Sequence, residues 1–497
     1  MRLSLAFVTV FLIAACGLGY QLIAGSVSSY LLGDSVTQFS LTIGLYLFAL
    51  GIGSYLSKYL EEEALVARFV AIELAVAVAG GFSSLVLQLS FASELWFRPV
   101  LYTTILVVGT LVGIEIPLLV RILKDELELK DLLARVLAFD YVGALAVALV
   151  FPLVLVPRLG LVRSALALGL VNALVAAWSV SIFHTRLRSS AWLRLQAGVV
   201  VALLLLGFAF AERLSFLGEH ELYANEIVHA ETSPYQRVVV TRARTGFQLF
   251  LNGSLQFSSD DEYRYHEALV HPAMAAAAEA RRVLVLGGGD GLAVREVLRH
   301  PEVERVTLVD LDRAVTDLAR TFPPLVVLNG NAFADPRVTV VNDDAMRWLA
   351  EERGTFDVVL VDFPDPHSFS VGKLYTQTFY ERLKAHLADD GALAVQATNP
   401  RLAPKSFWCI VRTLESVEFV ARPYCAGVPS FGEWGFVLAR KATFEPPTRL
   451  PEGLRFLTSE YLARLFVLSA DVQPVAVELN KLSTQALVRY YETEASP

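Results

Sequence analysis

Residues 251–272 of the chain are LNGSLQFSSDDEYRYHEALVHP, and acidic or glycine-rich segments follow at regular spacing: VLVLGGGDG (283–291), VTLVDLD (306–312), VNDDA (341–345), VLVDFPDP (359–366) and LYTQTFY (374–380). In these segments the carboxylates come just after apolar runs. A parallel sheet presents the carboxyl ends of its strands to a ligand at such positions. The stretch therefore predicts an α/β sheet whose crevice suits a nucleoside or a cation rather than a phosphate.

Strands and helices alternate around this stretch. We expect strands at 281–287, 305–312, 338–343, 357–363, 391–398 and 434–440, separated by helices at 292–299, 314–321, 345–352, 379–387 and 405–416. This order predicts a Rossmann-like, doubly wound α/β domain with a largely parallel sheet. Just before it, residues 235–258 alternate in polarity around the turn Asn252-Gly253, which predicts a small antiparallel sheet.

The first part of the chain is far more hydrophobic. Of 497 residues, 55% are apolar and 19% charged, and the apolar excess lies in residues 1–211. Segments of about 20 apolar residues can span a bilayer, and seven such segments lie at 5–30, 37–58, 66–90, 98–121, 134–157, 161–183 and 193–211. We therefore divide the chain into a multi-pass α-helical membrane domain of about seven helices (1–211), a linker with a small antiparallel β domain (212–280), a Rossmann-like catalytic domain (281–445) and a helical tail (446–497).

The membrane part predicts a multi-pass protein of the cell membrane, in contact with lipid. Lys and Arg gather at 58–68, 121–135 and 186–194, after the second, fourth and sixth helices, which favours a cytoplasmic N-terminus. Seven crossings would then place the catalytic domain outside the cytoplasm. The orientation stays open, with a preference for the cytoplasm.

Three carboxylates lie inside the apolar segments: Glu73, Glu115 and Asp140. A charge is costly in lipid, so each is a candidate functional group or a hydrogen-bonded link between helices. Asn172 and Gln21 are possible partners for them. Together the carboxylates allow a path for a cationic solute.

Charge and cysteine content exclude several functions. The formal net charge of −8 and the absence of a dense basic patch argue against nucleic-acid binding. Three cysteines, Cys16, Cys409 and Cys425, provide neither a metal-binding spacing nor a disulfide framework.

The glycine-rich turn and the acidic strand ends carry the chemistry. Gly287–Gly291 follows the first strand of the parallel sheet, and Asp310 ends the next strand, where a carboxylate typically binds ribose hydroxyls. Asp290, inside the turn, would repel a phosphate and attract an ammonium. Asp362 and Asp365 follow the fourth strand, three residues apart, so both can reach one bound cation.

These residues resemble the spermidine synthases, which are polyamine aminopropyltransferases. The resemblance covers about residues 235–440, and the preceding helices resemble those of the membrane-embedded bacterial branch. It is carried by Asn252-Gly253, Gln256, Asp261-Glu262, Tyr265-His266-Glu267, His271, the GGGDG turn, Asp344, Asp362-x-x-Asp365-Pro366 and Leu374-Tyr375…Phe379-Tyr380.

The resemblance implies transfer of an aminopropyl group from decarboxylated S-adenosylmethionine, a co-substrate, to putrescine, with no metal or resident cofactor. The implied donor-binding residues are Gln236, Asp290, Asp310, Asp344 and Ala345, with Asp290 on the aminopropyl ammonium. The implied polyamine-binding residues are His266, Asp290, Asp365, Tyr265 and Gln256, and Asp362 would be the catalytic base. Family members commonly form homo-oligomers.

The chain departs from the family pattern at several positions. Asp310 stands where Glu is usual, Ala345 where Gly is common and Phe431 where a Tyr often contacts the amine; the segment 367–373 also differs. These changes bear on the acceptor more than on the donor. Two alternatives remain: a methyltransferase that uses intact S-adenosylmethionine, and a polyamine transporter or sensor whose second half only binds its ligand.

Overall fold

The protein forms two compact units, Met1–Asn225 and Glu226–Pro497, in a computed structural model. It describes residues 2–32, 35–90, 94–183, 190–220, 223–448 and 450–495. Residues 186–189 of the predicted charged break at 186–194 lie outside these ranges.

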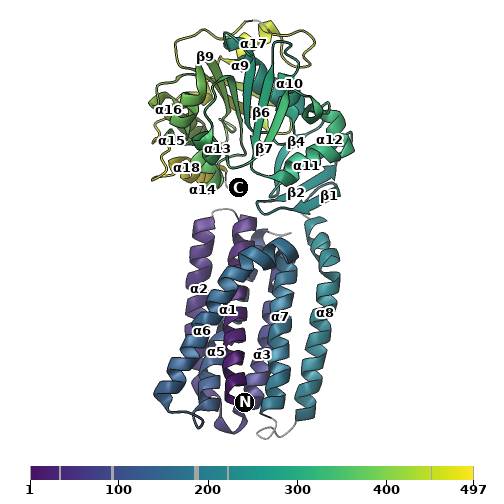
Figure 1. The fold of residues 1–497 in the computed structure, drawn as a ribbon, viewed down its shortest axis with the longest axis vertical. Helices are drawn as coiled ribbons and strands as arrows, with labels where there is room; N and C mark the ends of the chain where they lie inside the picture. The colour runs from purple at the N-terminus through teal and green to yellow at the C-terminus, as the bar shows by residue number, and fades with distance from the viewer. Residues whose placement is uncertain are drawn as a thin grey trace. The chain divides into compact units, whose positions relative to one another are not determined.

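The first unit is a bundle of long helices (Figure 1). Its helices are α1 (Arg2–Leu32), α2 (Ser35–Leu56), α3 (Leu65–Gly81), α4 (Ser83–Ser90), α5 (Glu94–Leu123), α6 (Leu129–Val150), α7 (Val156–Ile182) and α8 (Ser190–His220). They match the seven apolar segments, with α3 and α4 sharing the third segment. The last helix runs to His220, nine residues beyond the predicted end at 211.

Six segments of the described bundle are long and apolar enough to cross a membrane, and one of them, Leu129–Ile182, has 54 residues. A straight helix of that length would measure about 80 Å, against a hydrocarbon core of about 30 Å. The segment is not straight: a π-helical stretch at Phe151–Leu155 separates α6 from α7, and Gly160, with φ +70°, kinks α7 near its start. By length and composition it can therefore hold two candidate spans, α6 and α7, in line with the seven segments predicted from the sequence.

Two of the three predicted intramembrane carboxylates meet inside the bundle. Glu73 on α3 and Glu115 on α5 are 0% and 1% exposed and interact electrostatically. Asn172 of α7 donates to Glu73 Oε2 at 3.3 Å, as predicted. Asp140 and Gln21 are only half-buried.

The second unit holds two sheets. The four-stranded antiparallel sheet has the order β1-β2-β3-β4, formed by β1 (Glu226–Thr232), β2 (Arg237–Arg242), β3 (Phe247–Leu251) and β4 (Ser254–Ser258). The last three strands were predicted. The first was not, because residues 220–234 have the composition of a linker; β1 pairs with β2 over six residue pairs.

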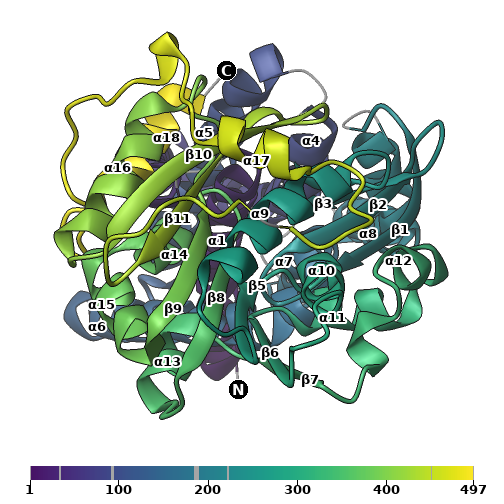
Figure 2. The same cartoon turned by 90° about the horizontal axis from the view of Figure 1, so that it is seen from above.

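The seven-stranded sheet has the order β10-β11-β9-β8-β5-β6-β7, which can be followed in Figure 2. Its strands are β5 (Arg282–Gly287), β6 (Arg305–Asp310), β7 (Val338–Asn342), β8 (Phe356–Asp362), β9 (Leu387–Gln396), β10 (Val420–Val428) and β11 (Gly432–Arg440). The strands β9, β8, β5, β6 and β7 are parallel, with β7 at one edge of the sheet, and β11 and β10 are antiparallel additions at the other edge. The doubly wound prediction is confirmed, although β10 was missed.

Helices cover both faces of this sheet. They are α9 (Glu262–Ala276), α10 (Leu292–Val297), α11 (Arg313–Thr321), α12 (Pro323–Leu328), α13 (Ala345–Glu351), α14 (Phe369–Gly372), α15 (Gln377–His386), α16 (Pro404–Ser416), α17 (Ser459–Leu465) and α18 (Ala486–Ala495). One face packs against α13, α15 and α16 and the other against α9, α10 and α17. The predicted helical tail (446–497) is less helical than expected, since its described residues form only the helices α17 and α18 and a short 3-10 helix at Ala470–Val472.

Close packing of α2 against α5 gives a prediction about the bundle. A Cβ atom at Gly53 would lie 2.0 Å from the backbone oxygen of Thr110, whereas one at Gly51 would have no neighbour within 4 Å. Gly53→Ala should therefore lower the thermal unfolding midpoint in detergent, at a cost of about 1–3 kcal/mol for overpacking. Gly51→Ala, the matched control, should keep or raise the midpoint because Ala favours a helix. Equal midpoints for the two variants would contradict the close contact.

Candidate active site

The glycine-rich turn brings the acidic strand ends together. β5 lies between β6 and β8, and Gly287 pairs with Asp362. A Cβ at Gly288 would lie 2.9 Å from Asp362 Oδ2, and one at Gly289 would lie 2.7 Å from Asp310 Oδ2. Gly287, Gly288 and Gly291 also have φ of +81°, +66° and +82°. Glycine is required here for two reasons: the backbone adopts positive φ angles, and a side chain would collide with the carboxylates of Asp310 and Asp362.

The carboxyl group of Asp310 is held by backbone amides. It accepts from Gly289 N at 3.0 Å and from Asp312 N at 2.8 Å. Removal from water nevertheless raises the pKa of Asp310 to about 7. The backbone therefore fixes the orientation of this partly buried carboxyl group, which loses its proton near neutral pH.

Asp290 lies in the same crevice. Its carboxylate accepts from Leu292 N at 2.9 Å at the start of α10. Desolvation raises the pKa of Asp290 to about 6, although the nearby His266 cation opposes the rise. A cationic ligand would therefore favour the charged form of this carboxyl group.

The other predicted donor-binding residues lie around Asp310. The backbone N–H of Gln236 donates to Ser233 Oγ at 3.0 Å, and this hydroxyl donates to Asp312 Oδ2 at 2.6 Å. Asp344 caps α13 by accepting from Met346 N and Arg347 N, and Ala345 is the first residue of that helix.

Asp344 has a partner that the sequence did not indicate. Lys373 Nζ lies 2.5 Å from Asp344 Oδ2. Desolvation would raise the pKa of Asp344, but this ion pair and the backbone amides hold it below its usual value. Any ligand group that binds Asp344 must therefore share this carboxylate with Lys373 or displace the Lys373 ammonium.

Asp362, at the end of β8, faces the helix that precedes the sheet. Tyr265 Oη on α9 donates to Asp362 Oδ1 at 2.6 Å. Desolvation raises the pKa of Asp362, while the His266 cation and the Tyr265 hydrogen bond oppose the rise. The predicted base is thus hydrogen-bonded on one oxygen.

His266 is fully enclosed and charged. Its Nδ1 lies 2.8 Å from Glu262 Oε2, and Glu262 also forms two hydrogen bonds with Arg295, at 2.8 and 2.9 Å. Burial alone would lower the pKa of His266, but the Glu262 carboxylate raises it to about 9. His266 therefore contributes a cation beside Asp290 and Asp362.

Asp365 is held on both oxygens. Tyr491 Oη donates to Asp365 Oδ2 at 2.7 Å, and Gln396 Nε2 lies 3.4 Å from Oδ1. Desolvation raises the pKa of Asp365 to about 6, against these hydrogen bonds. The buried hydroxyl of Tyr375 supports the same loop by donating to the backbone oxygen of Pro364 at 3.2 Å.

Aromatic rings line the α9 side of the crevice. Tyr265 makes ring contacts with Phe431, Trp434 and Phe436, at centroid distances of 6.4, 6.3 and 5.2 Å. Asp261 fixes the neighbouring loop by accepting from Ser430 N and Oγ. Phe431 therefore lies beside Tyr265, although it lacks the hydroxyl usual in the family.

Gln256 is the predicted site residue with the least connection to the others. Its amide donates to the backbone oxygen of Ser254 on its own strand, at 3.2 Å. The structure does not bring it to the acidic cluster through a hydrogen bond.

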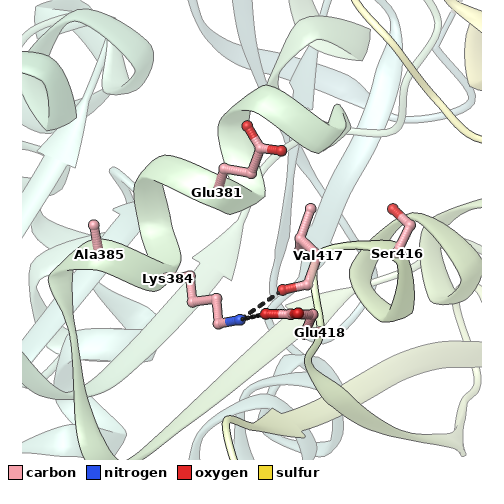
Figure 3. A pocket seen from close by; sticks show the side chains of 6 residues that line it. All are labelled: Glu381, Lys384, Ala385, Ser416, Val417 and Glu418. Atoms are coloured by element: carbon pink, nitrogen blue, oxygen red, sulfur yellow. Dashed lines mark hydrogen bonds and ion pairs between the residues drawn. The ribbon is translucent and has the colours of Figure 1, made fainter.

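A surface hollow between α15 and α16 is separate from this site. It is lined by Glu381, Lys384, Ala385, Ser416, Val417 and Glu418 (Figure 3). Lys384 bonds to Val417 O and to Glu418 there, both at 2.9 Å. None of the predicted site residues lines it. Within the described part of the chain, no group of three His, Cys, Asp or Glu side chains is arranged to hold a metal ion.

Comparison with known proteins decides the family. The spermine/spermidine synthase domain matches residues 262–446. Polyamine aminopropyltransferase 2 of Ralstonia nicotianae is 53% identical over 499 residues, 99% of this chain and 98% of that protein. The polyamine aminopropyltransferase of Leptospira interrogans is 49% identical, over 98% of each chain. The chain belongs to the polyamine aminopropyltransferases. It is an enzyme of aminopropyl transfer, as predicted, and the relatives give no support to the methyltransferase alternative.

Among solved structures, spermidine synthase in complex with the transition state analogue AdoDATO is 25% identical, with a TM-score of 0.47 over 50% of this chain and 88% of that chain. Spermidine synthase from Thermotoga maritima gives a TM-score of 0.45 at 25% identity, over 50% of this chain and 87% of that chain.

The pKa shifts predict an acid-sensitive enzyme. Asp310 takes up a proton below about pH 7, and Asp290 and Asp365 below about pH 6. Amine substrates keep their charge in this range, since alkylamine pKa values are near 10.4. Protonation of the carboxyl groups therefore removes the attraction, and kcat/KM should fall by about tenfold or more per pH unit below about pH 6.

The pH dependence is measured with the aminopropyl donor and a diamine between about pH 5.5 and 8.5. Full recovery of activity on return to neutral pH would separate titration from acid unfolding. A flat profile over this range would show that these carboxyl groups do not bind the cationic substrates.

Proposed function

We propose that the enzyme transfers the aminopropyl group of decarboxylated S-adenosylmethionine to putrescine, which gives spermidine and methylthioadenosine. The observation that supports this acceptor is the pair Asp362 and Asp365, enclosed three residues apart and hydrogen-bonded by Tyr265 and Tyr491. Two carboxylates suit a substrate with two amino groups, one that reacts and one that stays charged.

The donor occupies the Gly287–Gly291 side of the crevice in this proposal. Gln236 and Asp310 hold the nucleoside and its ribose, and Asp344 and Ala345 contact the adenine. Asp290 binds the ammonium of the aminopropyl chain, for which its enclosed carboxylate is suited. The positive sulfonium then lies among carboxylates rather than among cations.

The reaction needs a neutral amine in line with the sulfur–carbon bond. Asp362 accepts a proton from the reacting ammonium. The nitrogen lone pair attacks the methylene carbon next to sulfur, the carbon–sulfur bond breaks, and its electron pair stays on sulfur in methylthioadenosine. Asp365 holds the second ammonium, with His266, Tyr265 and Gln256 completing the amine site.

Asp362→Asn tests the base. The variant keeps the shape and the Tyr265 contact but cannot take the proton, so kcat should fall by about 10²–10⁴-fold. Products are identified by mass spectrometry with decarboxylated S-adenosylmethionine and a panel of amines. Asp389→Asn, at a carboxylate that is 97% exposed, is the matched control and should be fully active.

Three outcomes decide between aminopropyl transfer with Asp362 as the base and the alternatives. Spermidine and methylthioadenosine from the wild type but not from Asp362→Asn would support the proposal. Undiminished activity of that variant would exclude Asp362 as the base. A methylated product from intact S-adenosylmethionine would revive the methyltransferase.

We also propose that the helical unit is a multi-pass anchor in the cell membrane, in contact with lipid, and that the enzyme forms homo-oligomers. Support for lipid contact comes from α8, where Leu195, Val199, Leu203 and Leu206 are about half exposed at helical spacing. We place the catalytic unit in the cytoplasm, where the donor is available, against the Lys and Arg distribution.

Cysteine labelling tests the orientation. Seven spans place the α5–α6 turn and the end of α8 on opposite sides of a bilayer. With a cytoplasmic catalytic unit, a membrane-impermeant maleimide on intact spheroplasts should label Lys124→Cys but not Val327→Cys, at an α12 position that is 81% exposed. The three native cysteines are buried. The reverse pattern would place catalysis outside the cytoplasm, and permeabilised cells should label both variants.

A further inference from the structure

The C-terminal tail reaches the amine site. It follows the matched synthase domain, which ends at residue 446, and carries no motif that indicated chemistry. Yet Tyr491 on α18 donates to Asp365 Oδ2 at 2.7 Å, the shortest hydrogen bond that this carboxylate receives. A residue from the tail therefore contacts Asp365, to which we assign a role in binding the amine substrate.

The helix that carries Tyr491 is firmly attached to the catalytic unit. The carboxylate of Glu494 accepts from the backbone N–H of Lys405 at 2.8 Å and from Ser406 N and Oγ, both at 3.0 Å, at the start of α16. Near the start of α18, Val488 packs closely on Gly372. A Cβ atom added at Gly372 would lie 2.3 Å from Cγ2 of Val488. Tyr491 is thus presented from a fixed position.

The tail also holds the opposite wall of the amine site. The fully buried carboxylate of Glu267 on α9 accepts from the backbone N–H groups of Arg455, Phe456 and Leu457, at 2.7, 2.9 and 2.9 Å. Its neighbours on α9 are Tyr265 and His266. The same tail therefore fixes α9 and, through Tyr491, the loop after β8.

The Tyr491 contact restricts what Asp365 can do. With one oxygen bound to a phenol and the other near Gln396, the carboxylate cannot rotate freely, and fewer lone pairs remain for a ligand. The phenol donates to the charged form of Asp365, which helps to keep it ionised. An ammonium that arrives at the remaining lone pairs meets a carboxylate already oriented.

We propose that Tyr491 is a positioning residue of the amine acceptor site, which fixes Asp365 to receive the ammonium that does not react. This inference rests on the proposed diamine acceptor. It makes the tail part of the active site and a determinant of amine affinity, although the tail lies outside the synthase domain in sequence.

Tyr491→Phe tests the role, because the ring stays and only the hydroxyl is lost. The KM for the diamine should rise about tenfold, the difference that corresponds to about 1.4 kcal/mol. The KM for the donor and kcat should stay within about twofold. Loss of the hydrogen bond should also move the acid limb of kcat/KM for the diamine to higher pH, since the pKa of Asp365 rises further.

Tyr490→Phe is the matched control. The Tyr490 hydroxyl, on the same helix, accepts from the backbone N–H of Glu478 at 3.1 Å and has no contact with Asp365. It should leave both KM values and the pH profile unchanged. Thermal midpoints of the two variants report any loss of stability.

The outcomes separate this inference from the proposed function. If the wild type transfers aminopropyl groups to a diamine and the two variants behave alike, Tyr491 has only a structural role and the inference is wrong. If kcat and both KM values change together in Tyr491→Phe, it is also wrong. If the wild type accepts no diamine, the proposed function itself fails.

Discussion

The active site depends on the enclosure of four carboxyl groups around one glycine-rich turn. Asp290, Asp310, Asp362 and Asp365 are all partly removed from water, and this desolvation raises the pKa of each. Such a cluster is unfavourable, and the His266 cation offsets the unfavourable energy only in part, since the pKa values of Asp290 and Asp362 stay raised. Both substrates of an aminopropyltransferase bring positive charge, so binding relieves the repulsion that the fold maintains. The same repulsion works against ligands with a carboxylate or a phosphate.

The backbone makes this enclosure possible. Parallel pairing of β5 with β6 and β8 places Asp310 and Asp362 on either side of the turn. A side chain at Gly288 or Gly289 would occupy the space that these carboxylates use. The glycines thus set how closely the turn approaches Asp310 and Asp362.

The sequence indicated the parts of the site that are local to a strand end. Asp290, Asp310, Asp362 and Asp365 could be placed because each follows an apolar run. Tyr491 and Lys373 could not, since their contacts depend on how the tail and the segment after Pro366 pack.

Two strands escaped prediction for different reasons. The strand β1 is half-exposed and polar, like a linker, and β10 contains Pro423 and Gly427, residues that are unusual in a strand. Both are edge strands of their sheets, where a polar or interrupted sequence is tolerated.

The charge of His266 follows from the same electrostatics. Glu262 and the nearby carboxylates keep its pKa at about 9, so the free enzyme holds an imidazolium where the amine is expected. A diammonium substrate would add positive charge beside Asp290 and Asp362 and so lower the pKa of His266. Proton release from His266 and amine binding are therefore linked.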